Sequence, residues 1–261
     1  MFNKQFISNS FLQQEAGFVK KAFLKSHLYA GIAFLLSFFA ALIITTVAQR
    51  TGLNNSLGFL VASSVSLVAG FLIVIFSSFW LSVHRSMGTL ISTYVITWAL
   101  LTFGLSGVLL SVGQYNDIQG LQGLDFTQIN TALLIVGVVY IVTSFLGYKM
   151  SNKAGFRLSK FLFVLFIVST ALIIIMNIVF IFAFNQGVFS LYFLIITIVS
   201  LVFSVLSLIL SSFMTRKIAE SIQLSDNEQL INNFIAYTSF ILFFRLFILF
   251  IDILRLMSFR R

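Results

Sequence analysis

The longest uncharged stretch of this chain sets the strongest limit on its fold. No Asp, Glu, Lys or Arg occurs between Lys160 and Arg216, and only Asn185-Gln186-Gly187 interrupts the apolar run. A helix needs about 20 apolar residues to cross a bilayer, because backbone polar groups in hydrocarbon must be satisfied within the segment itself. The stretch is too long for one crossing. It therefore predicts two membrane-spanning helices joined by a tight turn.

Five further apolar segments of similar length bring the number of expected spans to seven. The seven expected spans cover residues 28–48, 57–83, 88–112, 131–148, 161–184, 189–213 and 231–257. Of the 261 residues, 59% are hydrophobic and 9% are charged, whereas a soluble domain carries roughly 25% charged residues. A water-soluble fold cannot hide so much apolar surface, which excludes soluble enzymes and disordered chains. We predict an all-α, multi-pass transmembrane helical bundle in a lipid bilayer.

The basic residues favour one side of the membrane. There are 16 Lys and Arg against 7 Asp and Glu, a net charge of +9, and cytoplasmic loops carry such an excess. Basic residues precede the first span and occupy the loops after spans two, four and six, whereas the alternate loops hold only Arg50, Asp117 and Asp125. This predicts a cytoplasmic N-terminus in a bacterial inner membrane, and no nucleic-acid motif occurs. Seven crossings would leave Arg260 and Arg261 outside, so a last segment that dips and returns stays an alternative.

A separate N-terminal segment is expected over residues 1–26, ahead of the transmembrane domain at 27–261. A helix over residues 11–25 places apolar side chains such as Phe18 and Phe23 on one side and its lysines mostly on the other. That pattern suits an amphipathic helix lying in the membrane interface. A plain cytoplasmic cap explains it equally well. The first apolar segment is too long for the core of a cleavable signal peptide.

No catalytic or metal-binding pattern is evident. The chain has no Cys, and neither an acidic pair, a metal-ligand cluster nor a phosphate-binding glycine loop occurs, so we expect no enzymatic activity, metal or cofactor. The motif Gly104-Leu105-Ser106-Gly107 resembles the serine motif of intramembrane rhomboid proteases. Its only candidate bases, His27 and His84, lie at the cytoplasmic borders of their spans, about 27 Å along a helix from Ser106 and out of hydrogen-bond reach.

Close helix packing is the better explanation of Gly104, Ser106 and Gly107, because small residues let helices approach in lipid. Asn177, inside the fifth span, is a polar residue of the kind that forms hydrogen bonds between helices.

Two ionisable residues lie inside the last span, Arg245 and Asp252. Each costs about 2.5 to 3.5 kcal/mol at the centre of a helix and is seldom retained without a role. They share one face of the helix, roughly 10.5 Å apart along its axis. Asp252 has a nearer partner in Arg255, three residues on, which predicts a surface pair reaching the interface. Arg245 is either a structural cation in the bundle interior or a gate or switch.

The same helix resembles a known family. Residues 242–255, Leu-Phe-Phe-Arg-Leu-Phe-Ile-Leu-Phe-Ile-Asp-Ile-Leu-Arg, resemble the last helix of the Bax inhibitor-1 (transmembrane Bax-inhibitor-motif) family, with five matches at Leu242, Leu249, Phe250, Leu254 and Arg255. Other pieces agree in order along the chain, namely Phe79-Trp80, Ala99-Leu100-Leu101-Thr102 with Gly104, Gly147-Tyr148-Lys149-Met150, and Asn177.

The resemblance implies a bundle with a central last helix and, in several members, a pH-sensitive leak of calcium or protons. Two aspartates that share a proton form the sensor in those members. In this chain Arg245 stands at the second position, and Met214 stands at the first when Ile218 is aligned to the family's Ile. Arg is always charged in proteins, so the family's proton switch cannot operate here in its usual form. The candidate gate or sensor positions are Arg245, Met214, Asp252 and Arg255.

Ion homeostasis or membrane-protein quality control is the expected role. In quality control the partner would be a membrane-embedded AAA protease or another membrane protein, as for some bacterial relatives. A fixed positive charge on a cation path opposes Ca²⁺ entry. A pH-gated calcium or proton leak channel and a small-solute or anion transporter remain the alternatives.

Overall fold

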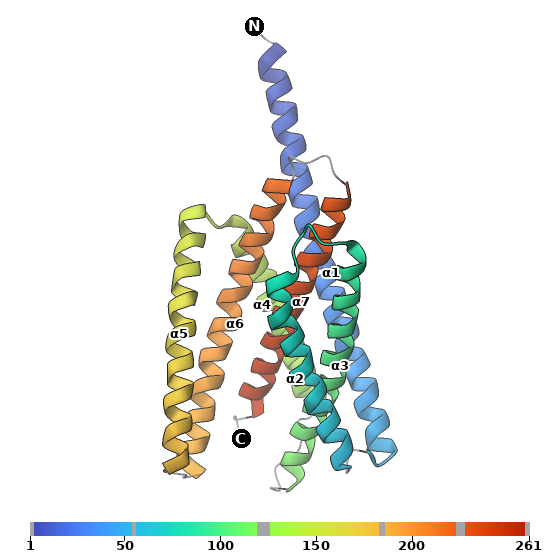
Figure 1. Cartoon of the computed structure of the whole chain (residues 1–261), viewed down its shortest axis with the longest axis vertical. Coiled ribbons are helices and arrows are strands. Elements are labelled where there is room, and N and C mark those ends of the chain that lie inside the picture. Colours follow the sequence, from blue (N-terminus) through green and yellow to red (C-terminus); the bar gives the residue numbers. More distant parts are fainter. Residues whose placement is uncertain (1–2, 54–55, 119–125, 183–185, 223–227, 259–261) are drawn as a thin grey trace. The chain divides into compact units, whose positions relative to one another are not determined.

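The computed structural model describes residues 3–53, 56–118, 126–182, 186–222 and 228–258, with side chains except in 3–16, 78–80, 111–118, 126, 173, 174, 176–182 and 186–191. Seven α-helices follow one another within these ranges, and no strand occurs among them (Figure 1). They are α1 Asn3–Arg50, α2 Leu57–Trp80, α3 Met87–Ile118, α4 Phe126–Lys149, α5 Asn152–Phe182, α6 Gln186–Ile222 and α7 Glu228–Ser258.

Local capping residues fix several helix ends. Gly52 follows the end of α1 with a φ of 74°, a left-handed conformation that glycine adopts without strain. Ser56 caps α2, since its hydroxyl accepts a hydrogen bond from the Phe59 backbone N–H at 3.2 Å. The hydroxyl of Ser86 does the same for α3 and that of Ser151 for α5. These short polar linkers therefore separate consecutive apolar helices.

All seven helices are long and apolar enough to cross a membrane. The mean hydropathy of their most apolar windows lies between 1.7 and 2.9. The prediction of seven spans is therefore confirmed. Several helices run beyond the predicted spans: α1 begins at Asn3 instead of Leu28, and α6 continues to Ile222 instead of ending at Phe213.

Polar and apolar side chains are distributed in the opposite way from a soluble protein. Large apolar residues such as Leu134, Ile141 and Phe163 are 66% to 71% exposed. Small hydroxyl side chains are buried instead, including Ser37, Ser106 and Ser212, each 0% exposed. Hydrocarbon solvates the apolar surface, whereas hydroxyl groups find partners only inside the bundle. This distribution agrees with an integral membrane protein.

The chain divides into two compact units. Unit 1 comprises Met1–Tyr115 and Met214–Phe244, and unit 2 comprises Asn116–Phe213 and Arg245–Arg261. In unit 1 polar groups connect α1 to α3. The hydroxyls of Ser37 and Thr102 lie 2.8 Å apart, and the Trp98 indole N–H donates to the Ala33 carbonyl at 3.0 Å.

Helix α7 is the most enclosed of the seven spans. Two thirds of its most apolar window (67%) is buried, against 50% for α3 and less for the others. It runs without interruption from Glu228 to Ser258, a length of about 46 Å at 1.5 Å per residue, which exceeds a hydrocarbon core of about 30 Å. The alternative that the last segment dips and returns is therefore wrong.

The N-terminal stretch continues directly into the first span. Helix α1 is unbroken from Asn3 to Arg50, and its residues Val19 and Ala22 are buried in one cluster with Ala219 of α6 and Phe234 of α7. This apolar side packs on protein, which favours a cap on the end of unit 1 over a helix lying in the membrane interface. The side chains of Phe11 and Leu12 lie outside the described residues.

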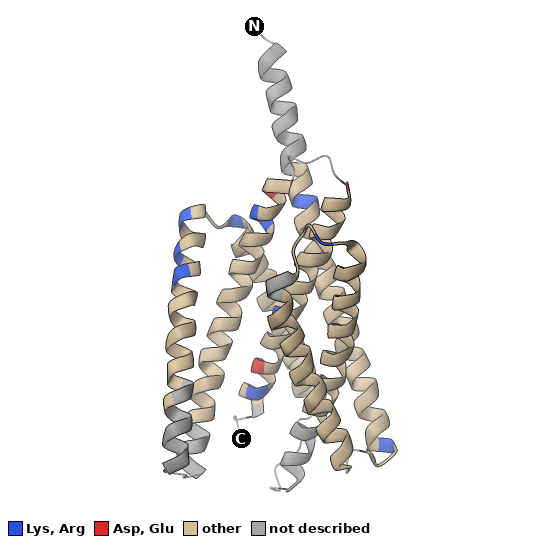
Figure 2. Cartoon of the chain, viewed as in Figure 1, with Lys and Arg blue, Asp and Glu red and all other residues tan. Residues whose placement is uncertain are grey.

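Basic residues gather at one end of each unit (Figure 2). In unit 1 the cluster around Phe234 joins the helix ends that carry Lys20, Lys21, Lys25, Arg85, Arg216 and Lys217. In unit 2 the junction of α4 and α5 carries Lys149, Lys153, Arg157 and Lys160. The other ends of the described residues carry Arg50 in unit 1 and Arg255 in unit 2.

Candidate charge site on the last helix

Asp252 is buried between α7 and α6 and is held by two serines. The whole residue is 2% exposed. One oxygen, Oδ1, accepts a hydrogen bond from the Ser200 hydroxyl at 2.9 Å, and Oδ2 accepts one from the Ser204 hydroxyl at 2.6 Å. The two serines are four residues apart, so they lie one turn from each other on the same face of α6. Both carboxylate oxygens are thus satisfied inside the bundle.

The expected surface position of the Asp252–Arg255 pair is wrong, because Asp252 is buried, although Arg255 still acts on the carboxylate electrostatically. Arg255 is exposed, and Asp252 points to α6 instead of the surface. A carboxyl group inside lipid is tolerated when donors from a neighbouring helix meet it, which also ties the two helices together. The serine pair is the signal that sequence reasoning missed, since Ser200 and Ser204 recur at helical spacing opposite the acidic residue.

Arg245 lies two turns before Asp252 on α7 and has the opposite character. Its side chain is half-buried, and the buried Nε has no hydrogen-bond partner. No ion pair joins Arg245 to Asp252 in the described part of the chain. Counting the helical rise back from the Asp252 contact places Arg245 roughly level with Ser207 of α6. The Ser207 hydroxyl already donates to the Ser204 carbonyl at 2.9 Å. The guanidinium of Arg245 therefore keeps one buried donor, Nε, without a hydrogen-bond partner.

Ser200 also connects this site to a groove on unit 2. The groove, about 250 Å³ in volume, runs between α5 and α6 and is mostly apolar. Ser169 and Thr170 contribute the other hydroxyl groups of its lining, although each donates to a carbonyl of its own helix. Ser200 thus both donates to Asp252 and lines the mostly apolar groove.

Two further candidates, one sensor position and one packing residue, lie on α6 and α5. Met214 is 43% exposed on α6 and belongs to unit 1. Asn177 lies in α5, and its side chain is outside the described residues.

The glycines at 104 and 107 let α3 approach α2 closely. A Cβ atom at Gly104 would lie 2.7 Å from the Cβ of Leu67, and one at Gly107 would overlap the side chain of Ser63. No larger residue fits without moving α2. Both glycines thus occupy a tight helix contact of the kind that small residues make in lipid.

Ser106 has the geometry of a packing residue. It is fully buried, and its hydroxyl donates to the Phe103 carbonyl at 2.6 Å. Thr45 of α1 donates to the Ser106 carbonyl at 3.3 Å. His27 lies 18 residues before Thr45 on α1, about 27 Å along the axis, and its ring nitrogen bonds the Phe23 carbonyl at 2.9 Å. His27 is therefore too far from Ser106 to act as its base.

The described residues hold no group of three His, Asp or Glu that would bind a metal ion. The last helix thus carries one carboxylate with hydrogen-bond donors on both oxygens, Asp252, and one guanidinium with an unpaired Nε, Arg245. Comparison with family models, curated proteins and solved structures gives no match for this chain. Inferences about its function therefore rest on these residues.

Proposed function

We propose that the chain is a Bax inhibitor-1-type integral membrane protein that acts in ion homeostasis and does not leak calcium. The observation that carries this is Arg245, whose buried Nε has no partner in the most enclosed helix. The resemblance aligns Arg245 with an aspartate of the family's proton sensor. A guanidinium stays charged, so a carboxylate dyad cannot form at this position.

The sign of the charge decides against a calcium path. A divalent cation about 6 Å from a fixed positive charge is repelled by about 5 kcal/mol at an effective dielectric near 20. Asp252 lies two turns from Arg245 and forms no ion pair with it among the described residues, so its charge offsets this repulsion only in part. Passage of calcium next to Arg245 would therefore be slow.

The proposed setting is a bacterial inner membrane with the N-terminus in the cytoplasm. The support is the basic ends of the two units, which carry ten Lys and Arg among the described helix ends and loops, six in unit 1 and four in unit 2. Cytoplasmic ends of membrane helices carry such an excess.

Calcium flux into liposomes tests the proposal. We expect purified wild-type protein to pass no Ca²⁺ at acidic or neutral pH, and Arg245→Asp to admit Ca²⁺ at least about tenfold faster, since a barrier lower by about 1.4 kcal/mol gives that factor. Arg255→Asp is the matched control, because it makes the same charge change on an exposed residue of the same helix. A pH-dependent calcium flux in wild type that Arg245→Asp leaves unchanged would overturn the proposal.

A small-anion transporter is the second candidate, and the unpaired Nε of Arg245 favours it. A half-buried guanidinium without a carboxylate partner attracts an anion. Chloride flux in the same liposomes distinguishes the two candidates. We expect Arg245→Gln to abolish chloride flux if the residue binds the anion, whereas Arg255→Gln should leave it unchanged.

A role in quality control would give a different pattern. The wild-type protein would then pass neither ion, and a membrane-embedded protease or another membrane protein would co-purify with it. We propose no enzymatic activity, which Ser106→Ala tests: loss of a hydrolytic activity in this variant would contradict the packing role.

A further inference from the structure

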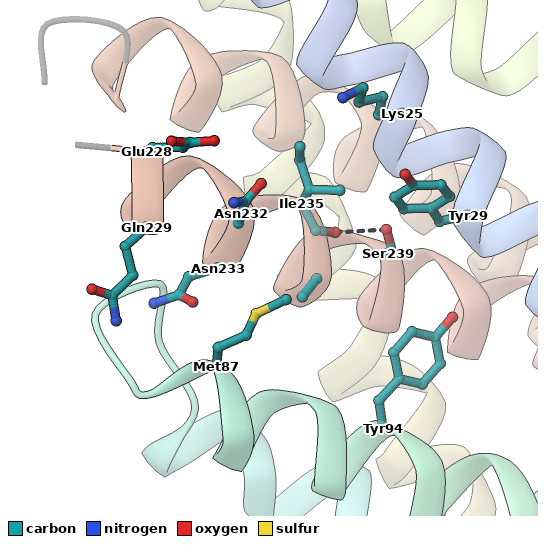
Figure 3. Close-up of a pocket in the computed structure, with 11 residues that line it drawn as sticks. Lys25, Tyr29, Met87, Tyr94, Glu228, Gln229, Asn232, Asn233, Ile235 and Ser239 are labelled. Atoms are coloured by element: carbon teal, nitrogen blue, oxygen red, sulfur yellow. Dashed lines mark hydrogen bonds between the residues drawn. The ribbon is translucent and has the colours of Figure 1, made fainter. Parts of the chain in front are cut away.

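A cavity in unit 1 lies at the basic end, where α1, α3 and the start of α7 meet (Figure 3). Its volume is about 710 Å³, within the range of ligand sites. Figure 3 shows its three walls: Lys25 and Tyr29 come from α1, Met87 and Tyr94 from α3, and the residues from Glu228 to Ser239 from α7. None of the residues of the charge site lines it.

Two buried polar atoms of the cavity wall have no partner. Asn233 is 4% exposed, and its amide N–H donates to the Arg85 carbonyl at 2.7 Å, which fixes the orientation of the amide. The other end of that amide, Oδ1, is buried and unpaired. The Tyr94 hydroxyl is also buried and unpaired, on a ring that contacts Phe240 and Phe243 at centroid distances of 5.5 and 5.6 Å.

Internal contacts do not account for these groups. The Ser239 hydroxyl, which also lines the cavity, is already used by the carbonyls of Ile235 and Ser26. Buried polar groups are normally satisfied. An amide oxygen that faces a cavity lacks a donor, and a tyrosine hydroxyl lacks an acceptor or a donor. A ligand with an N–H group would complement the Asn233 oxygen at this wall.

Opposite charges line the same cavity from different helices. Lys25 of α1 and Glu228 of α7 both contribute, and no ion pair joins them in the described part of the chain. An ammonium and a carboxylate that do not neutralise each other are complementary to a ligand that carries both charges. Carboxamides at Gln229, Asn232 and Asn233 form much of the wall between them, and such groups match the N–H and C=O of peptide bonds.

We propose that this cavity binds a short peptide with free ends, of two or three residues. Glu228 and the Asn233 oxygen receive the N-terminal ammonium, and Lys25 with the Tyr94 hydroxyl receives the C-terminal carboxylate. The apolar side chains of Met87, Ile235 and Ala236 in the lining contact the peptide's side chains. A free amino acid would fill only a small part of a cavity of about 710 Å³, which favours a peptide.

Binding of trialanine to the full chain in nanodiscs, measured by calorimetry, tests the site. We expect saturable binding that N-acetylation or C-amidation of the peptide weakens at least about tenfold each. Glu228→Gln should remove the sensitivity to N-acetylation only, and Lys25→Met the sensitivity to C-amidation only. A purely structural role of either residue would weaken all peptides alike.

Lys21→Met is the matched control, since Lys21 is an exposed lysine of the same helix that does not line the cavity. It should bind every peptide as wild type does. Equal binding of trialanine and its doubly blocked form, or no binding of trialanine by the folded wild type, would overturn the assignment. So would binding of phosphoethanolamine without binding of trialanine, because the ligand would then be a lipid headgroup.

Discussion

Arg245 and Asp252 lie two turns apart on the last helix and carry opposite charges, but they differ in their hydrogen-bond partners. Asp252 has a donor on each carboxylate oxygen, from Ser200 and Ser204. Arg245 has a buried Nε without any partner. Both residues belong to unit 2, and both are in the helix with the largest buried share. Asp252 therefore contributes to the contact between α6 and α7, whereas Arg245 keeps a buried donor without a partner.

This difference separates a structural charge from a functional one. A charge that serves the fold acquires partners, because an unpaired charge in the bundle is costly. A charge that stays unpaired lowers stability, and such groups are enriched at functional sites. We therefore expect variants of Asp252 and its serines to change stability, and variants of Arg245 to change activity.

The largest loss of stability is expected when both serines are removed. The double variant Ser200→Ala, Ser204→Ala leaves a buried carboxylate without donors, which should lower the free energy of unfolding by about 2 to 3 kcal/mol. Unfolding in mixed micelles of increasing denaturing detergent measures it. Ser169→Ala at the nearby groove is the control, since that hydroxyl bonds only its own helix, and it should change little. A loss no greater than in this control would contradict the structural role of the pair.

A smaller loss, about 1 kcal/mol, is expected when the same contact is broken from the other side by Asp252→Leu. The two serine hydroxyls then turn to backbone carbonyls of their own helix, as hydroxyls in membrane helices do, and no charge remains buried. Combining Asp252→Leu with both serine changes should cost about as much as Asp252→Leu alone, because the penalty of the stranded carboxylate disappears. Additive losses in that triple variant would show that the serines act independently of Asp252.

The sequence predicted the number of helices but not the partners of Asp252. The long apolar runs decide where the chain crosses lipid, and all seven appear. The predicted helix ends were less accurate than the number of helices. Hydropathy indicates the length that crosses lipid, whereas capping residues fix where a helix ends, as Gly52 does, or begins, as Ser56 does. Asp252 was assigned to Arg255 because that neighbour is three residues away, while Ser200 and Ser204 are 52 and 48 residues away.

Arg245 itself could be located in the last span from sequence, yet its lack of a partner could not. Whether a guanidinium has an acceptor depends on how neighbouring helices pack around it. The local sequence around the residue does not show this packing. The cavity of unit 1 was missed for the same reason. Lys25, Tyr94 and Asn233 come from three helices far apart in the sequence, and no local motif links them.

Replacing Arg245 by Met should change stability least among the three buried positions, and in the stabilising direction by up to about 1 kcal/mol. The variant removes an unpaired guanidinium and keeps the length of the side chain. Since no partner is lost, nothing is stranded. Unfolding in mixed micelles measures the change, and Arg255→Met, on an exposed residue, should stay within about 0.5 kcal/mol of wild type. If Arg245→Met instead lowers stability as much as the serine double variant, then Arg245 is a structural cation, and the contrast between the two charges of α7 does not hold.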